Sequence, residues 1–82
     1  MVKFTITINS VEAVQKFNRI AQRCEGEVDA TSGHYVVDAK SIMGLFSLDL
    51  SREISVLIYQ ESDAELVDKA LGAQKIEYRK GG

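Results

Sequence analysis

The sequence lacks proline and tryptophan, and it contains only one cysteine and one histidine. The lone Cys24 cannot form an intramolecular disulfide, which agrees with a reducing compartment. With no second histidine and no cysteine pair, a metal site has little support, and we expect no cofactor. Because no apolar run approaches the roughly 20 residues of a membrane span and no signal-peptide pattern opens the chain, we expect a cytoplasmic protein without a membrane partner.

The sequence also shows no excess of basic charge. Ten Lys and Arg residues are scattered among twelve Asp and Glu residues, for a net charge of −2 at pH 7. Nucleic-acid binding needs a concentrated basic surface, so nucleic acid is not expected as a partner. P-loop, nucleophile-elbow and glycine-rich dinucleotide motifs are missing as well, and we expect that the protein is not an enzyme.

Length and composition indicate one small globular domain. The chain has 82 residues, of which 45% are apolar and 27% charged, and these shares are typical of a folded protein rather than a disordered one. A second domain does not fit in this length. We therefore predict a single domain over residues 1–82, with residues 79–82 as a mobile tail.

The first third of the chain predicts a strand followed by a helix. Apolar and polar residues alternate over residues 2–8, as in a half-buried strand. Asn9 and Glu12 are spaced as a capping box, although Ser10 offers an alternative cap one residue later. Apolar residues at helical spacing then predict a helix over about residues 11–24, which turns its last apolar residues toward the core.

The remaining pattern predicts three more strands and a second long helix. Residues 27–31 and 34–37 flank Ser32-Gly33, a pair suited to a tight hairpin because glycine accepts a positive φ. Residues 54–58 are largely apolar on both sides, which indicates a central strand. A helix then opens at Ser62 and ends near Gly72.

The order β-α-β-β-(short α)-β-α predicts an α+β fold. Its natural form is an open-faced β-sandwich, in which helices cover one face of a four-stranded antiparallel sheet. A ferredoxin-like domain, such as an ACT ligand-binding module, has nearly the same order of elements. The pattern of elements alone does not distinguish the two folds.

The segment from Asp38 to Leu50 distinguishes them. Ser41 precedes an apolar half-turn, so its side chain can accept a hydrogen bond from a backbone N–H near Gly44. Residues 40–44, Lys-Ser-Ile-Met-Gly, closely resemble the regulatory-serine segment of HPr, the small phosphocarrier of the bacterial sugar phosphotransferase system. The resemblance runs from Gly33 to about Leu50, and the order of elements agrees over most of the chain. We therefore expect an HPr-like fold.

The resemblance implies a site at this segment. Ser41 matches the position that HPr kinase/phosphorylase modifies in many Gram-positive bacteria, while Ile42, Met43 and Phe46 match exposed apolar contacts for partner proteins. Lys40 would partly offset the charge of a phosphate on Ser41. The structural alternative is that Ser41 serves only as a helix cap and that some apolar neighbours fill the core. Leu45, Leu48 and Leu50 are the expected core residues.

The carrier site is where the sequence departs from the family. HPr places a phospho-acceptor histidine, an arginine and a proline between its first strand and first helix, and here Asn9, Ser10 and Glu12 occupy that stretch. A serine forms a stable phosphoester instead of a labile phosphoramidate, and Glu12 would repel phosphate. His34 lies elsewhere, beside the predicted hairpin turn. The resemblance thus implies a degenerate carrier site, as in the Crh branch of the family, which also lacks this histidine.

The resulting hypothesis is an HPr-like regulatory or protein-binding module related to the phosphotransferase system. Its expected partners are HPr kinase/phosphorylase, a transcriptional regulator or other phosphotransferase-system proteins, and its expected state is a monomer or weak dimer. The alternative is a small ligand-sensing or structural module that reuses the fold without phosphotransfer. A true phosphocarrier ranks third.

Overall fold

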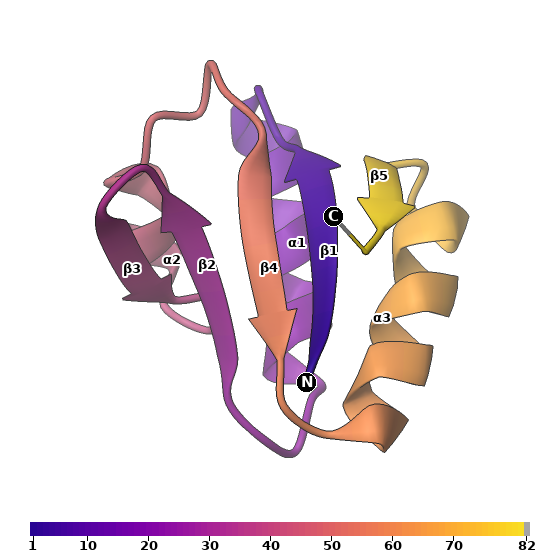
Figure 1. The fold of residues 1–82 in the computed structure, drawn as a ribbon. Coiled ribbons are helices and arrows are strands. Elements are labelled where there is room, and N and C mark those ends of the chain that lie inside the picture. The colour runs from indigo at the N-terminus through magenta and orange to yellow at the C-terminus, as the bar shows by residue number, and fades with distance from the viewer. Residues whose placement is uncertain (82) are drawn as a thin grey trace.

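The computed structural model describes residues 1–81, which form three helices and one five-stranded sheet (Figure 1). The strands are β1 (Val2–Thr7), β2 (Val28–Ser32), β3 (Tyr35–Asp38), β4 (Ile54–Ile58) and β5 (Glu77–Lys80). The helices are α1 (Val11–Gln22), α2 (Ile42–Phe46) and α3 (Glu61–Ala73). This is the α+β arrangement that the sequence pattern predicts.

The sheet is antiparallel throughout and has the order β3-β2-β4-β1-β5. The apolar strand β4 is central, as predicted. Val56 lies opposite Phe4 of β1 on one side and opposite Ala30 of β2 on the other, and all three residues are fully buried. Three strands therefore contribute one continuous apolar layer to the same face of the sheet.

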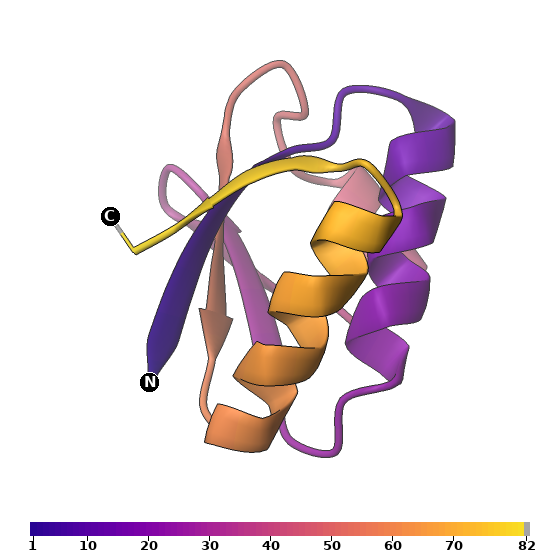
Figure 2. The same cartoon turned by 90° about the vertical axis from the view of Figure 1, so that its right-hand side faces the viewer.

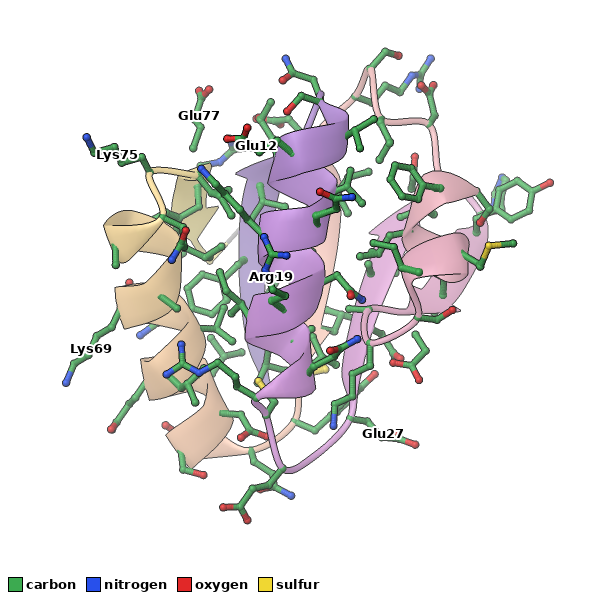
Figure 3. All side chains as sticks on the ribbon, turned by 180° about the vertical axis from the view of Figure 1, so that it is seen from behind. Glu12, Arg19, Glu27, Lys69, Lys75 and Glu77 are labelled. Atoms are coloured by element: carbon green, nitrogen blue, oxygen red, sulfur yellow. The ribbon has the colours of Figure 1, made fainter. Side chains whose placement is uncertain are left out.

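The helices cover that apolar face, and the opposite face is open (Figure 2). Viewed from behind, α1 lies between α3 and α2, in front of the strands (Figure 3). The core consists of the inward face of the sheet and the apolar stripes of the two long helices. Its helical members are Val14, Phe17, Ile20 and Ala21 of α1, and Ala64, Val67, Ala70 and Leu71 of α3.

The prediction of a four-stranded sheet is wrong by one strand. β5 pairs with the outer side of β1, with Tyr78 opposite Ile6 and Lys80 opposite Phe4. The ring of Tyr78 lies 6.0 Å from that of Phe4, and its hydroxyl donates a hydrogen bond of 2.6 Å to Asp68 of α3. Pairing with β1 and packing against α3 thus stabilise a segment whose own sequence is mostly charged.

The end of the chain differs from the predicted mobile tail for the same reason. Arg79 and Lys80 belong to β5, and the N–H of Gly81 donates to the carbonyl of Lys3 at 2.7 Å. Arg79 also makes two hydrogen bonds to the carboxylate of Glu53, at 2.7 and 3.1 Å. The prediction for Gly82 lies outside the described residues.

Two helix starts differ in detail from the sequence patterns. Ser10, rather than Asn9, caps α1: its side chain accepts the N–H of Ala13 at 3.1 Å. α3 begins at Glu61 after Gln60, whose side chain makes no capping bond, so Ser62 lies inside the helix. The acidic residues of this first turn complement the positive end of the helix dipole.

Asp63 has a structural role that its sequence position does not reveal. Its carboxylate is buried and accepts the N–H groups of Glu25 and Gly26, at 3.0 and 2.8 Å. These two backbone groups lie in the loop between α1 and β2, and both hydrogen bonds are partly buried. Asp63 therefore ties the start of α3 to the loop that follows α1.

Candidate functional site

Ser41 caps α2, as the sequence predicts. Its side-chain oxygen accepts the N–H of Gly44 at 3.2 Å, and its backbone is extended, with φ −95° and ψ 112°. The N–H of Ser41 donates to the carbonyl of Asp38 at 2.9 Å, which links the cap to the end of β3. The residue is exposed to solvent. The hydroxyl therefore has a structural partner and is still accessible to another protein.

Gly44 explains why α2 can lie so close to β3. A Cβ at this position would lie 3.2 Å from the Cβ of Val37 and 3.5 Å from the carbonyl oxygen of Asp38. The next residue, Leu45, is fully buried and anchors the helix to the core. Leu48 is also buried and Leu50 partly so, in line with their predicted core positions. The short helix is thus held from one side only.

The other side of α2 presents apolar side chains to solvent. Met43 is 79% exposed and Phe46 is 41% exposed. Ile42 differs from these two, because it is half-buried and packs against the core. Of the three predicted partner contacts, Met43 and Phe46 therefore form the accessible part, which we call the α2 patch.

Lys40 does not point its charge at Ser41. Its ammonium donates to the carbonyl of Cys24 at 2.8 Å, at the end of α1. The expected offset of a Ser41 phosphate by Lys40 is thus missing in this arrangement. Cys24 itself is buried, and burial, followed by the charge of Asp63, raises the pKa of its thiol despite the opposing charges of Lys40 and Arg23. A raised pKa keeps the thiol protonated and unreactive.

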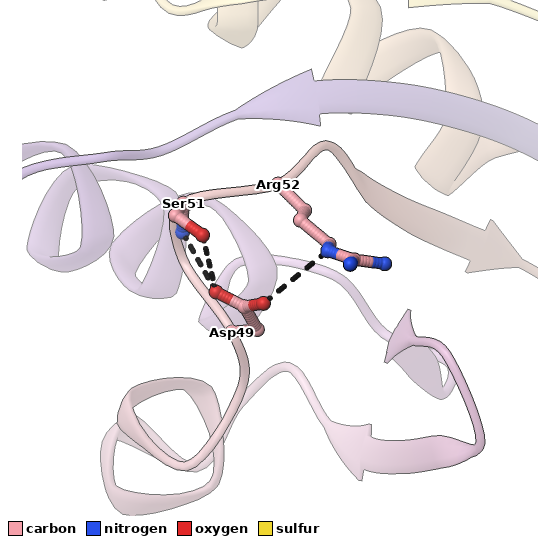
Figure 4. A network of polar contacts seen from close by, with 3 residues as sticks. All are labelled: Asp49, Ser51 and Arg52. Atoms are coloured by element: carbon pink, nitrogen blue, oxygen red, sulfur yellow. Dashed lines mark hydrogen bonds and ion pairs between the residues drawn. The ribbon is translucent and has the colours of Figure 1, made fainter.

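A short polar network closes the loop after α2 (Figure 4). The carboxylate of Asp49 accepts the hydroxyl and the N–H of Ser51, at 2.6 and 3.1 Å, and lies 3.4 Å from the Nε of Arg52. The hydrogen bonds from Ser51 are the main cause that lowers the pKa of Asp49, and the charge of Arg52 adds to it. The network orders the chain between α2 and β4.

The predicted degenerate carrier site lies at the start of α1. Asn9, Ser10 and Glu12 line an open hollow of about 270 Å³, together with residues of the turn between α3 and β5. Figure 3 shows Glu12 at the same end of the molecule as Lys75 and Glu77, which also line the hollow.

The hollow is polar and of mixed charge. Glu12 forms an exposed ion pair of 3.2 Å with Lys16, one turn along α1. The residues that line the hollow include no histidine, and His34 is exposed in the turn between β2 and β3. Two acidic residues and two lysines thus surround the capping Ser10, at the place where HPr proteins have their phospho-acceptor histidine.

Among residues 1–81, no three His, Cys, Asp or Glu side chains lie together in a way that could hold a metal ion. No helix in the same part of the chain has both the length and the apolar character to cross a membrane.

The geometry defines a class of protein: an α+β open-faced sandwich with a serine-capped surface helix after its third strand. No protein-family model matches the chain, and no curated protein sequence does. Among solved structures, it is similar to HPr-C-His from Thermoanaerobacter tengcongensis, with a TM-score of 0.73 and 25% sequence identity over 89% of each chain. The protein has an HPr-like fold.

Proposed function

We propose that this protein is an HPr-like regulatory or protein-binding module related to the phosphotransferase system, controlled by phosphorylation at Ser41. The observation that carries the proposal is the exposed, capping Ser41 directly beside the exposed α2 patch, within an HPr-like fold. The partners would be proteins: a kinase of the HPr kinase/phosphorylase type, a transcriptional regulator or other phosphotransferase-system proteins. We place the protein in the cytoplasm on the same resemblance.

The α2 patch supports docking because it exposes apolar area without a structural need. The buried Leu45, with the half-buried Ile42, anchors the helix to the core, so Met43 and Phe46 add little to the core. A methionine packs adaptably against different partner surfaces, and an aromatic side chain brings a large contact area. Ile42, half-buried, would contribute only its outer edge.

Phosphorylation would change the charge of this patch without breaking the helix cap. A phosphoserine carries a charge of about −1.5 to −2 and three acceptor oxygens. One of these oxygens can replace the hydroxyl as acceptor for the N–H of Gly44, which now lies 3.2 Å from the Ser41 oxygen. Asp38 adds a second negative charge at the end of β3. The modified surface would therefore favour partners with basic side chains over purely apolar ones.

The start of α1 supports neither a phosphohistidine carrier nor an enzyme. Ser10 is engaged as a cap, and Glu12 places negative charge beside it. The second candidate function, a small ligand-sensing module, draws on the hollow of about 270 Å³ at this place. A ligand there would need to satisfy two acids as well as two lysines, so we rank this function below protein docking.

Intact-mass analysis after exposure to two phosphoryl donors tests the proposal. With HPr kinase and ATP, we expect one phosphoryl group on the protein, none on Ser41→Ala, and an unchanged yield on Ser10→Ala. With enzyme I and phosphoenolpyruvate, we expect no modification. Acid-labile phosphate from phosphoenolpyruvate would instead show a working carrier, and failure of ATP labelling would remove the regulatory part of the proposal.

A charge placed in the α2 patch tests docking. Met43→Asp should abolish binding to HPr kinase in a direct binding assay and leave the thermal unfolding curve nearly unchanged, because the side chain is 79% exposed. Ser62→Asp is the matched control: it adds the same charge at an exposed position on α3, on the other side of α1 from α2 (Figure 3). Equal binding by both variants would refute docking through α2.

A further inference from the structure

The outer edge of β3 offers backbone groups for pairing with another strand. β3 is the end strand of the sheet and lies outermost in Figure 1. Val37 pairs with Ala30 of β2. Two residues further along the chain, in the same register, the N–H of Ala39 donates to the carbonyl of Val28 of β2, so Ala39 and Val37 both direct their backbone groups toward β2. In an antiparallel pair, hydrogen-bonded residues alternate with residues that point away. The N–H and carbonyl of Val36 therefore point outward, where no other strand of residues 1–81 lies.

Two large apolar side chains of this edge are exposed. Tyr35 is 68% exposed and Val36 is 63% exposed. The opposite edge differs: β5 has the sequence Glu-Tyr-Arg-Lys, and Arg79 is paired with Glu53. Charged residues on an edge strand prevent pairing with other chains, whereas an exposed apolar edge promotes it. β5 has three such charged residues, whereas β3 has one, Asp38 at its end.

We propose that β3 pairs antiparallel with β3 of a second copy of this chain, joining two five-stranded sheets into one. The proposal is independent of the function proposed above. The occupant must be an extended strand, because the groups to be satisfied are an unpaired N–H and carbonyl of the backbone. A second copy brings such a strand with the same outward residues.

The register follows from which residues point outward. His34, in the turn just before β3, alternates with Val36 and Asp38 of the strand, so a two-fold axis at Val36 places Val36 opposite its own copy. The same register places His34 opposite Asp38 of the second copy at both ends. Shifting the axis to Asp38 would bring two carboxylates together, which is unfavourable. The central register thus pairs apolar with apolar and imidazole with carboxylate.

Sedimentation of the full chain over micromolar to millimolar concentrations tests the proposal. We expect the mass to rise from that of the 9.1 kDa monomer toward twice that value. Val36→Lys should raise the dissociation constant at least about tenfold, since it replaces two facing apolar side chains with two charges. Val36→Pro should weaken the dimer as well, because it removes the outward N–H but no bond to β2.

Val11→Lys is the matched control. Val11 is 62% exposed, close to the 63% of Val36, and lies at the start of α1 rather than on the sheet edge. It should dimerise like the wild type, and circular dichroism should show that all variants are folded. A wild type that stays monomeric throughout would overturn the proposal. So would a dimer that survives both Val36 variants, or one that Val11→Lys weakens equally.

Discussion

Ser10 and Ser41 perform the same local task in very different surroundings. Each precedes a helix in extended conformation, and each accepts the N–H of the third residue on, at 3.1 Å for Ser10 and 3.2 Å for Ser41. Ser10 opens a helix of 12 residues beside a polar hollow, where Glu12 and Lys16 form an ion pair. Ser41 opens a helix of five residues beside the exposed α2 patch.

The comparison shows that capping alone says little about function. A cap bond satisfies a backbone N–H wherever a helix begins, so both serines are explained structurally. What differs is the surface around them: mixed charges at Ser10, and exposed methionine and phenylalanine at Ser41. We assign the proposed function to the second serine because of its neighbours and not because of its hydrogen bond.

The largest expected effect on stability comes from Asp63. Like the two serines, it accepts backbone N–H groups, but its side chain is buried. Asp63→Ala removes the acceptor for the N–H groups of Glu25 and Gly26. We expect the free energy of unfolding to fall by about 3 kcal/mol, because bonds to a charged acceptor are strong and two of them, both partly buried, are lost together. Urea denaturation measures this. Asp63→Asn, which keeps one acceptor oxygen, should lower the free energy of unfolding by less. If Asp63→Ala lowered it by less than removal of either serine cap does, the buried carboxylate would not be the stronger of these interactions.

The two serine caps should contribute nearly equally to stability. Ser10→Ala and Ser41→Ala should each lower the free energy of unfolding by about 1 kcal/mol, since each leaves one exposed helix N–H to water alone. The same denaturation experiment compares them, with Ser10→Thr and Ser41→Thr as controls that keep the cap oxygen. If Ser41→Ala had no effect on stability, capping would not explain that serine.

The smallest expected effect is a pH dependence on the Ser41 side of the molecule. Hydrogen bonds from Ser51 hold the pKa of Asp49 below its ordinary value of 3.8. Because the pKa is lower in the folded state, the network stabilises the fold above the unfolded pKa, and this contribution disappears as pH falls through the folded pKa. The wild type should therefore lose slightly more stability in acid than Asp49→Asn. If stability fell with pH equally in the wild type and in Asp49→Asn, the Asp49 network would contribute nothing to the stability of the fold.

Most of the fold could be predicted because its elements have strong local patterns. Alternation over the first strand, the hairpin turn, which lies at Gly33-His34 and thus one residue later than predicted, and the largely apolar β4 each depend on neighbours in sequence. β5 lacks such a pattern, since three of its four residues are charged and its order comes from β1 and α3. The hydrogen bonds of Asp63 could not be predicted either, because its partners lie 37 and 38 residues away in the chain.

The candidate site could likewise be predicted only where it depends on neighbours in sequence. The capping role of Ser41 follows from its place before an apolar turn, and the structure confirms it. Helical spacing over five residues could not separate the exposed Met43 and Phe46 from the half-buried Ile42. Nor could it show that the ammonium of Lys40 turns toward the carbonyl of Cys24.

The sequence by itself determined the cap at Ser41, the hairpin, the central strand and the resemblance of residues 40–44 to the regulatory-serine segment of HPr. These depend on short-range hydrogen bonds and on the periodicity of apolar residues. Only the tertiary structure decided the fifth strand, the bonds of Asp63, and which side chains of α2 face water. Those depend on which distant segments meet, because burial and strand pairing are properties of the packed chain.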